Sequence, residues 1–151
     1  MKTFISINFL IFFTVYANAQ INDPVTWSYT AKKTADKAYE LHITAAVGLN
    51  WHIYPQDAGN APGATTFTFI PNPLIKLEGN VAEIGKLESF FDKNLKSVIK
   101  YYSNTVDFVQ QVKVKSAAKT VVKGKVVFVA CNDKKCLPPK EIQFVINLGA
   151  Q

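Results

Sequence analysis

Apolar and polar residues alternate with a period of two along most of this 151-residue chain. The clearest run, VTWSYTAKK, sets Val25, Trp27 and Tyr29 against threonine and serine. Such alternation is typical of strands that bury one face. Similar β-rich runs are YELHITAAV, TTFTFI, VDFVQQVKVK, KTVVKGKVVFVA and EIQFVINL. Glycine and proline separate these runs, so the pattern predicts an all-β, immunoglobulin-like antiparallel β-sandwich of about seven or more short strands.

One segment, EIGKLESFFDKNLKSVIKYY at residues 83–102, lacks a clear alternation. It is expected to form either a short helical turn or a long loop that crosses between the sheets. Phe90 and Phe91 are adjacent within it, and neighbouring residues of a strand face opposite ways. In an extended conformation one of the two rings is therefore exposed or covers another group. In a helical turn both rings could pack on the core.

The N-terminus has the features of a secretory signal peptide. Lys2 precedes an apolar stretch at residues 4–16, and Ala-Asn-Ala at residues 17–19 forms an A-x-A cleavage site. The apolar stretch is shorter than the roughly 20 residues of a membrane-spanning helix. We therefore expect removal of residues 1–19 and one domain over residues 20–151. That domain is expected to be periplasmic or secreted, soluble, and not inserted in a membrane.

The net charge of +6 is the balance of 17 lysines against 11 acidic residues, and the chain has no arginine. Lysines spaced along strands usually mark solvated faces and protected sheet edges. A nucleic-acid site would need a basic cluster interleaved with aromatic residues, and the sequence has no such cluster. We therefore expect no nucleic-acid partner, and only a mild attraction to acidic partners.

The only two cysteines, Cys131 and Cys136, lie in the segment VVFVACNDKKCLPPKEIQFVINL. If the two apolar runs form a hairpin, NDKK is its connecting loop and the cysteines face each other across its mouth. Opposed strand residues have Cβ atoms about 4.5–5.5 Å apart, so slight adjustment allows a disulfide. An exported protein also resides where such a bond persists.

This disulfide could be a structural staple or a reactive pair. Closing a loop of about six residues contributes roughly 2 kcal/mol, less than half the contribution of a loop of about a hundred residues. A position near the end of a sheet favours reactivity, and the charges of Lys134 and Lys135 favour a thiolate at Cys136, with Asp133 opposing in part. Many exported β-proteins nevertheless carry an inert hairpin disulfide, and the spacing leaves both alternatives open.

The residues that follow the pair suit the docking of a partner protein. Pro138 and Pro139 cannot donate backbone hydrogen bonds, so this segment is stiff and leaves an open edge near the sulfurs. We therefore expect Leu137, Pro138 and Pro139 to form a docking lip.

The cysteine segment resembles the end of the N-terminal periplasmic domain of the thiol:disulfide interchange protein DsbD. In that family a strand leads to two cysteines in a short loop, then to an aromatic or aliphatic residue, Pro-Pro and a final strand. NWHIYPQ at residues 50–56 is similar to the family's Trp-x-x-Tyr stretch, and ESFFDK at residues 88–93 to its acidic-aromatic loop. Order and spacing agree from residue 25 to residue 148, although the cysteine loop is shorter than in the best-known members.

The resemblance implies that the Cys131–Cys136 pair passes reducing equivalents to partner proteins, which is the work of a protein thiol-disulfide oxidoreductase. The implied partners are a thioredoxin-like domain as electron donor, here on a separate protein, and periplasmic oxidoreductases as acceptors. By analogy Cys136 attacks first. The resemblance also implies an aromatic cap over the sulfurs. Its site residues here are the cap candidates Phe90 and Phe91 and the neighbours Tyr54, His52 and Glu88.

Two alternative functions stay open at this point. One is a binding module of the same fold, whose hairpin disulfide never turns over. The other is a metal-binding protein, since two cysteines with His42 or His52 could bind zinc or copper(I). The cysteine spacing is wide for a zinc knuckle, and His42 belongs to a polar strand face. We therefore expect neither a metal nor any other cofactor.

Overall fold

The structure is a computed structural model that describes residues 23–116 and 119–149, so the predicted signal peptide at residues 1–19 lies outside it. Within these ranges the chain forms eleven strands and no helix. In chain order they are β1 (Val25–Ala35), β2 (Ala38–Val47), β3 (His52–Ile53), β4 (Thr66–Phe69), β5 (Ile75–Gly85), β6 (Glu88–Asp92), β7 (Ser97–Tyr101), β8 (Thr105–Val114), β9 (Thr120–Phe128), β10 (Ala130–Cys131) and β11 (Lys140–Leu148).

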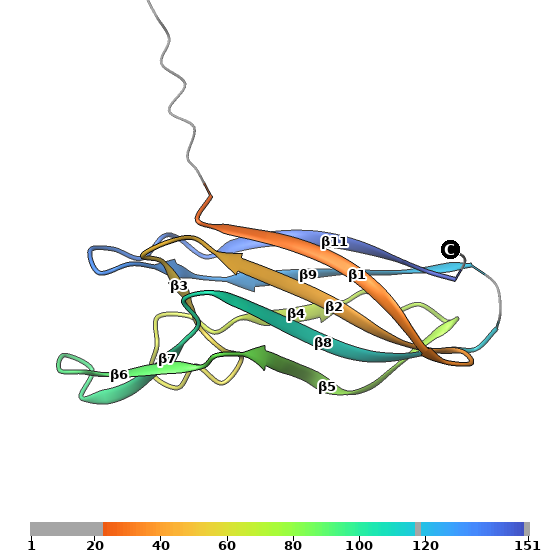
Figure 1. The fold of residues 1–151 in the computed structure, drawn as a ribbon, viewed down its shortest axis with the longest axis horizontal. Helices are drawn as coiled ribbons and strands as arrows, with labels where there is room; N and C mark the ends of the chain where they lie inside the picture. The colour runs from red at the N-terminus through yellow and green to blue at the C-terminus, as the bar shows by residue number, and fades with distance from the viewer. Residues whose placement is uncertain (1–22, 117–118, 150–151) are drawn as a thin grey trace, which may run out of the picture.

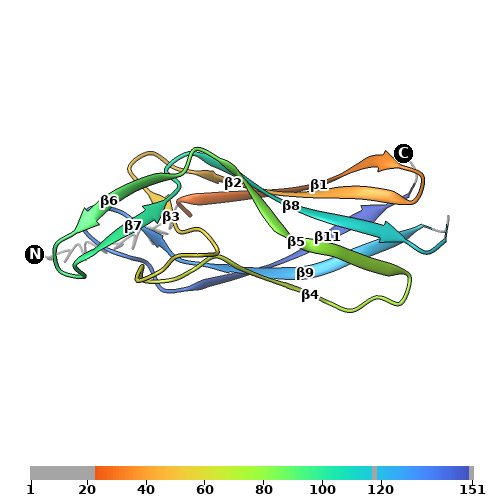
Figure 2. The ribbon, with the colours of Figure 1, turned by 90° about the horizontal axis from the view of Figure 1, so that it is seen from below.

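Two antiparallel sheets pack face to face (Figures 1 and 2). The larger sheet has the strand order β1-β2-β8-β5, and the smaller has the order β11-β9-β4. Two short pairs, β10-β3 and β6-β7, lie together at one end of the sandwich. The predicted all-β, immunoglobulin-like antiparallel sandwich is therefore confirmed.

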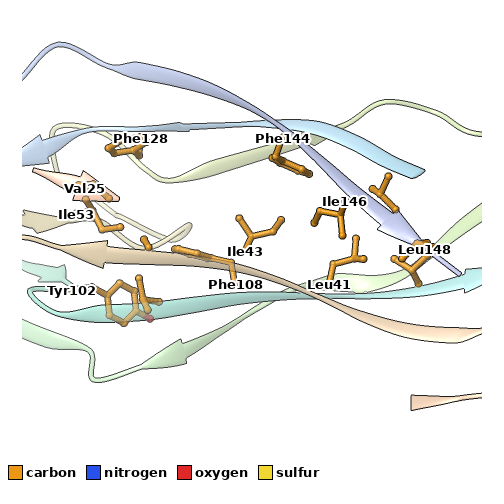
Figure 3. Close-up of a cluster of buried hydrophobic side chains, with 14 of the residues drawn as sticks. Val25, Leu41, Ile43, Ile53, Tyr102, Phe108, Phe128, Phe144, Ile146 and Leu148 are labelled. Carbon is orange, nitrogen blue, oxygen red and sulfur yellow. The ribbon is translucent and has the colours of Figure 1, made fainter. Parts of the chain in front are cut away.

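The hydrophobic core lies between the two sheets (Figure 3). In β2 the side chains of Leu41, Ile43 and Ala45 are fully buried, while the residues between them are half-buried. Alternate side chains of β9 and β11 are buried from the other sheet: Val122, Val126, Phe128, Phe144, Ile146 and Leu148. Period-two alternation thus places one apolar face of each sheet against the other, which is where most of the folding free energy arises.

A glycine in β9 allows the close packing of this core. Gly124 is the register partner of Phe144 in β11, and the Phe144 ring covers it. A Cβ atom at Gly124 would lie 2.5 Å from Phe144 Cζ and 2.7 Å from the carbonyl oxygen of Thr68. Only a residue without a side chain fits between these groups.

Residues 83–102 form a β-hairpin, so both expectations for this segment, a helical turn or a crossing loop, were wrong. β5 leads into β6 and β7 leads into β8, which makes the β6–β7 pair the tip of one long hairpin (Figure 1). This tip projects beyond the sandwich, and every side chain of β6 and β7 except that of Ile99 is at least partly exposed. With little core to face, its strands need no strict apolar alternation, and the periodicity therefore failed to reveal them.

Candidate functional site

Cys131 and Cys136 form a disulfide whose Cα atoms are 4.0 Å apart. Backbone hydrogen bonds flank the pair on both sides, from Asn132 N to Lys135 O (2.9 Å) and from Leu137 N to Ala130 O (2.8 Å). This is the non-hydrogen-bonded pairing of antiparallel strands, which brings opposed side chains closest together. The predicted facing of the two cysteines across a hairpin mouth is confirmed.

The four-residue loop between the cysteines is held by Asn132. Its side-chain oxygen accepts hydrogen bonds from the backbone N–H groups of Lys134 and Lys135, each at 2.9 Å. Such Asx turns favour a chain reversal, here together with the backbone hydrogen bond from Asn132 N to Lys135 O. Two residues separate Phe128 from Cys131 but three separate Cys136 from Lys140, so a bulge lies between the main ladder and the disulfide.

The two cysteines differ sharply in exposure. Cys131 is 1% exposed and packs in a second apolar cluster with Tyr54, Ile99 and Val129. Cys136 belongs to the exposed residues of the loop. One sulfur-bearing residue is therefore part of the protein interior, while its partner faces solvent.

A groove of about 1000 Å³ opens beside the disulfide. Its wall includes both cysteines, β3 with the residues around it, and one face of the β6–β7 hairpin. Of the residues predicted near the pair, His52, Tyr54, Glu88 and Phe90 line the groove, and Phe91 does not. The structure thus brings together four of the five residues that the resemblance singled out as neighbours or caps.

Two backbone pairings assemble this wall from distant parts of the sequence. Cys131 is the register partner of His52 in the β10–β3 pair. Ile53, the next residue of β3, exchanges two hydrogen bonds with Tyr102, from Ile53 N to Tyr102 O at 3.0 Å and from Tyr102 N to Ile53 O at 2.8 Å. Although β3 is only two residues long, it joins the base of the hairpin to the cysteine segment.

Aromatic rings form a row along the groove. The Phe90 ring meets the Tyr101 ring edge-on, with centroids 5.7 Å apart. The Tyr101 ring lies 5.1 Å from the imidazole of His52, which in turn lies 5.4 Å from the Tyr54 ring. The row runs from the exposed Phe90 to His52, the residue that pairs with the buried Cys131.

The charges in the groove wall are negative. Glu88, Asp92 and Asp133 line the groove, and no lysine among the described residues does. Lys134 and Lys135 are exposed and outside this set. Glu88 is paired with Lys86 at 3.2 Å. The carboxylates of Asp92 and Asp133 oppose the effect of Lys134 and Lys135 on a thiolate, and the sequence indicated only the contribution of Asp133.

Burial and hydrogen bonding shift three titrating groups in the wall. Burial lowers the pKa of His52 below its ordinary value, because the imidazolium loses hydration, while Asp133 acts in the opposite direction. Burial raises the pKa of the Tyr54 hydroxyl. Ser103 donates a hydrogen bond of 2.6 Å to Glu88, which holds the pKa of that carboxyl below its usual range.

In the predicted docking lip, one residue packs against the protein and two are exposed. Leu137 is half-buried and packs against the main core, and its N–H closes the cysteine hairpin. Pro138 and Pro139 are exposed. This arrangement leaves a stiff, solvent-facing segment directly after Cys136.

The described residues offer no ready metal site. Across residues 23–116 and 119–149, no three His, Cys, Asp or Glu side chains are grouped so that they could hold a metal ion. His42 lies outside the groove, where it hydrogen-bonds to Asp107 of β8 at 2.6 Å. The same part of the chain also contains no helix with the length and apolar character needed to cross a membrane.

Sequence reasoning missed several residues of the groove. Ile99 and Tyr101 line it from β7, and Asp92 lines it from β6. In the sequence, Ile99 and Tyr101 stand two residues apart, a short alternation that could have indicated a strand with one inward face. No comparable signal marked Asp92.

Comparison with known proteins bears on the fold. No protein-family model matches the sequence, and no curated protein matches it. The crystal structure of the N-terminal periplasmic domain of ScsB from Proteus mirabilis is similar, with a TM-score of 0.59 and 16% identity. The match covers 85% of this chain and 47% of that one, so the chain spans about half the length of the ScsB structure.

The reduced N-terminal domain of DsbD from Neisseria meningitidis is also similar, with a TM-score of 0.50 and 15% identity. This match covers 77% of the present chain and 81% of the DsbD domain. The chain has the fold of these periplasmic domains. The resemblance predicted from the cysteine segment is thus confirmed for the fold, at sequence identities too low to carry activity across.

Proposed function

We propose that this protein is an exported thiol-disulfide exchange domain, which passes reducing equivalents to partner proteins through Cys131 and Cys136. The observation that carries the proposal is the difference in exposure within one disulfide, since Cys131 is 1% exposed and Cys136 faces solvent beside a groove. An exchange protein needs one sulfur that a partner can reach and a second held ready to displace the partner.

In the reducing direction the Cys136 thiolate attacks one sulfur of a partner's disulfide, and the partner's other sulfur leaves as a thiolate. The Cys131 thiolate then attacks Cys136 Sγ, which reforms the Cys131–Cys136 bond and releases the partner's second thiolate. Two electrons and two protons pass to the partner, which departs as a dithiol. A separate donor of thioredoxin-like type would restore the reduced pair by the reverse steps.

The small contribution of this disulfide to stability also supports the proposal. The bond closes a loop of about six residues, which contributes roughly 2 kcal/mol. The sandwich around it has a continuous core between two sheets, so we expect it to fold without this short hairpin link. Pro138 and Pro139, exposed just after Cys136, offer a stiff edge on which a partner could dock.

The proposed location is the periplasm. The signal-peptide features of residues 1–19 indicate export, and the fold is shared with the periplasmic domains of ScsB and DsbD. Disulfide exchange between proteins is sustained in that compartment.

The test has two arms. Equilibration of the protein with glutathione redox buffers should give a reduction potential well above about −300 mV. Structural disulfides have potentials below this value. Cys131→Ser, which keeps the exposed cysteine, should trap a mixed disulfide with a periplasmic partner, and Cys136→Ser should trap far less. A potential below that limit, with no adduct in either variant, would instead identify a binding module with an inert disulfide.

A further inference from the structure

His52 is the residue that faces Cys131 across the β3–β10 pair. Directly opposed residues of antiparallel strands have Cβ atoms roughly 4.5–5.5 Å apart, so the imidazole and the Cys131 sulfur start within one side chain's reach. Both residues also line the same groove as Cys136. His52 is the only histidine in the described wall of the groove, and it lies directly opposite the buried cysteine.

Cys131 is the sulfur that most needs a proton acceptor. A buried thiol ionises reluctantly, because the thiolate loses its hydration. Three carboxylates line the groove, and Glu88 among them is paired with Lys86 at 3.2 Å. The negative charge of the other two, Asp92 and Asp133, further disfavours a thiolate. Asp and Glu side chains are already ionised at neutral pH, and tyrosine hydroxyls are still protonated, so an imidazole is the side chain suited to exchange protons there.

The surroundings of His52 hold its ring in place. The ring lies between those of Tyr54 and Tyr101, with centroids 5.4 Å and 5.1 Å away. Its Nε2 atom is 3.3 Å from the Tyr54 hydroxyl. Burial favours the neutral imidazole, the form that can accept a proton, and Asp133 stabilises the imidazolium that then forms. The other charged groups near this space are Asp92 and Glu88 of β6, and Lys86, which is paired with Glu88 at 3.2 Å.

We propose that His52 takes the proton from the Cys131 thiol when that sulfur resolves a mixed disulfide. This inference rests on the proposed exchange function. As Cys131 Sγ loses its proton to the imidazole, it attacks Cys136 Sγ, and the bond between Cys136 and the partner's sulfur breaks. The partner's sulfur leaves with the electron pair of that bond and receives the proton back from His52. In the reverse direction the imidazolium protonates Cys131 as it leaves the disulfide.

The experiment separates the two cysteine steps with a neutral probe, so that the carboxylates of the groove do not repel it. The reduced protein is mixed with one equivalent of 4,4'-dithiodipyridine, and release of thiopyridone is followed by stopped flow. Attack by Cys136 releases the first equivalent, and resolution by Cys131 releases the second. His52→Gln is compared with wild type and with His42→Gln, a matched control in which the histidine lies outside the groove.

We expect His52→Gln to slow the second phase by about a hundredfold at pH 7, the lower end of the range for general acid–base effects. The rate of the second phase should also begin to increase with pH at a higher pH in His52→Gln than in wild type, because the Cys131 thiol must then ionise without a base. The rate of the first phase should stay within about twofold of the wild-type rate, because Cys136 is exposed and the imidazole takes no part in its attack. Both phases of the control should also stay within about twofold. An unchanged second phase, or equal slowing of both phases, would overturn the role of His52.

A second measurement does not depend on a variant that folds. The pKa of His52 can be followed by NMR through its imidazole proton resonances in the oxidised and the reduced protein. In the reduced protein the Cys131 thiol can hydrogen-bond to the imidazole, a contact that the disulfide cannot make as a donor, so the pKa of His52 should differ between the two states. Identical values would contradict the contact on which the inference depends. If the reduced protein fails to release even the first equivalent of thiopyridone, the proposed exchange function itself is contradicted.

Discussion

Phe90 and Phe91 are neighbours in β6 and lie on opposite faces of the β6–β7 hairpin. Phe90 lines the groove beside the disulfide and contacts Tyr101, whereas Phe91 pairs with Val98 outside the groove and is 61% exposed. The alternation of side chains along a strand allows only one of two adjacent rings to face the sulfurs. The proposal of an aromatic cap therefore rests on Phe90.

Phe90→Ala should speed the reduction of the disulfide by dithiothreitol several-fold. An apolar ring at the groove hinders a small thiolate, which must approach along the S–S axis. The rate of reduction, measured beside a circular dichroism spectrum, checks this expectation. Phe91→Ala is the matched control and should reduce at the wild-type rate. Equal rates in all three proteins would rule out the cap.

Cys131→Ala with Cys136→Ala should leave the domain folded at 25 °C. The disulfide closes a short loop, so its loss should lower the free energy of unfolding by about 2 kcal/mol. Urea denaturation of the double variant and of the reduced wild type should give similar losses. An unfolded double variant would show that the pair is a structural staple after all.

The hydroxyl of Tyr102 should make the stability sensitive to alkaline pH. Burial, and then a 2.7 Å hydrogen bond to Glu83, raise the pKa of Tyr102 well above its ordinary value. The folded protein keeps this proton where the unfolded chain loses it. The stabilisation is therefore complete below about pH 10 and declines as the pH rises further.

Tyr102→Phe tests this dependence. Removal of the hydroxyl should lower the free energy of unfolding by about 1–2 kcal/mol near neutral pH. The loss is no larger because Glu83 keeps its hydrogen bonds from Gln56. Above about pH 10 the variant should lose stability less steeply than wild type. Some decline should persist, since burial also raises the pKa of Tyr29 and Tyr54. Parallel curves for the two proteins, from urea unfolding between neutral and alkaline pH, would contradict the assignment.

Gly124→Ala should destabilise the sandwich without touching the groove. The new methyl group would collide with the Phe144 ring and the Thr68 carbonyl oxygen, the latter at a backbone position that cannot turn aside. Overpacking of this kind costs about 1–3 kcal/mol. Thermal unfolding should show a lower Tm, while the rate of dithiothreitol reduction stays unchanged. Lys123→Ala, at an exposed neighbouring position, provides the control.

The alternation of residues within each run was enough to predict the sandwich. Val25, Trp27 and Tyr29 in β1, and Leu41 and Ile43 in β2, face the core as their spacing indicated. A strand side chain has only two directions, so a local pattern records which face is buried. The pairing of the cysteines was predictable for a similar reason, because a four-residue loop brings its own ends together.

The groove depended on contacts between residues far apart in the chain. His52 meets Cys131, and Tyr101 meets His52, only because β3 pairs with one segment on each side. Local periodicity carries no information about which strands become neighbours. The resemblance to a known family supplied part of that information, by pointing to Tyr54, His52 and Glu88.

The sequence by itself therefore determined the all-β class, the inward faces of the strands that form the two packed sheets, and the disulfide partners, all of which follow from local spacing. It did not reveal β6 and β7, which have little core to face. Only the tertiary structure decided that Cys131 is buried and Cys136 exposed, that Phe90 rather than Phe91 lines the groove, and that carboxylates outnumber lysines there. Burial and electrostatic environment are sums over everything that packs around a group. They become defined only when segments distant in sequence are brought together.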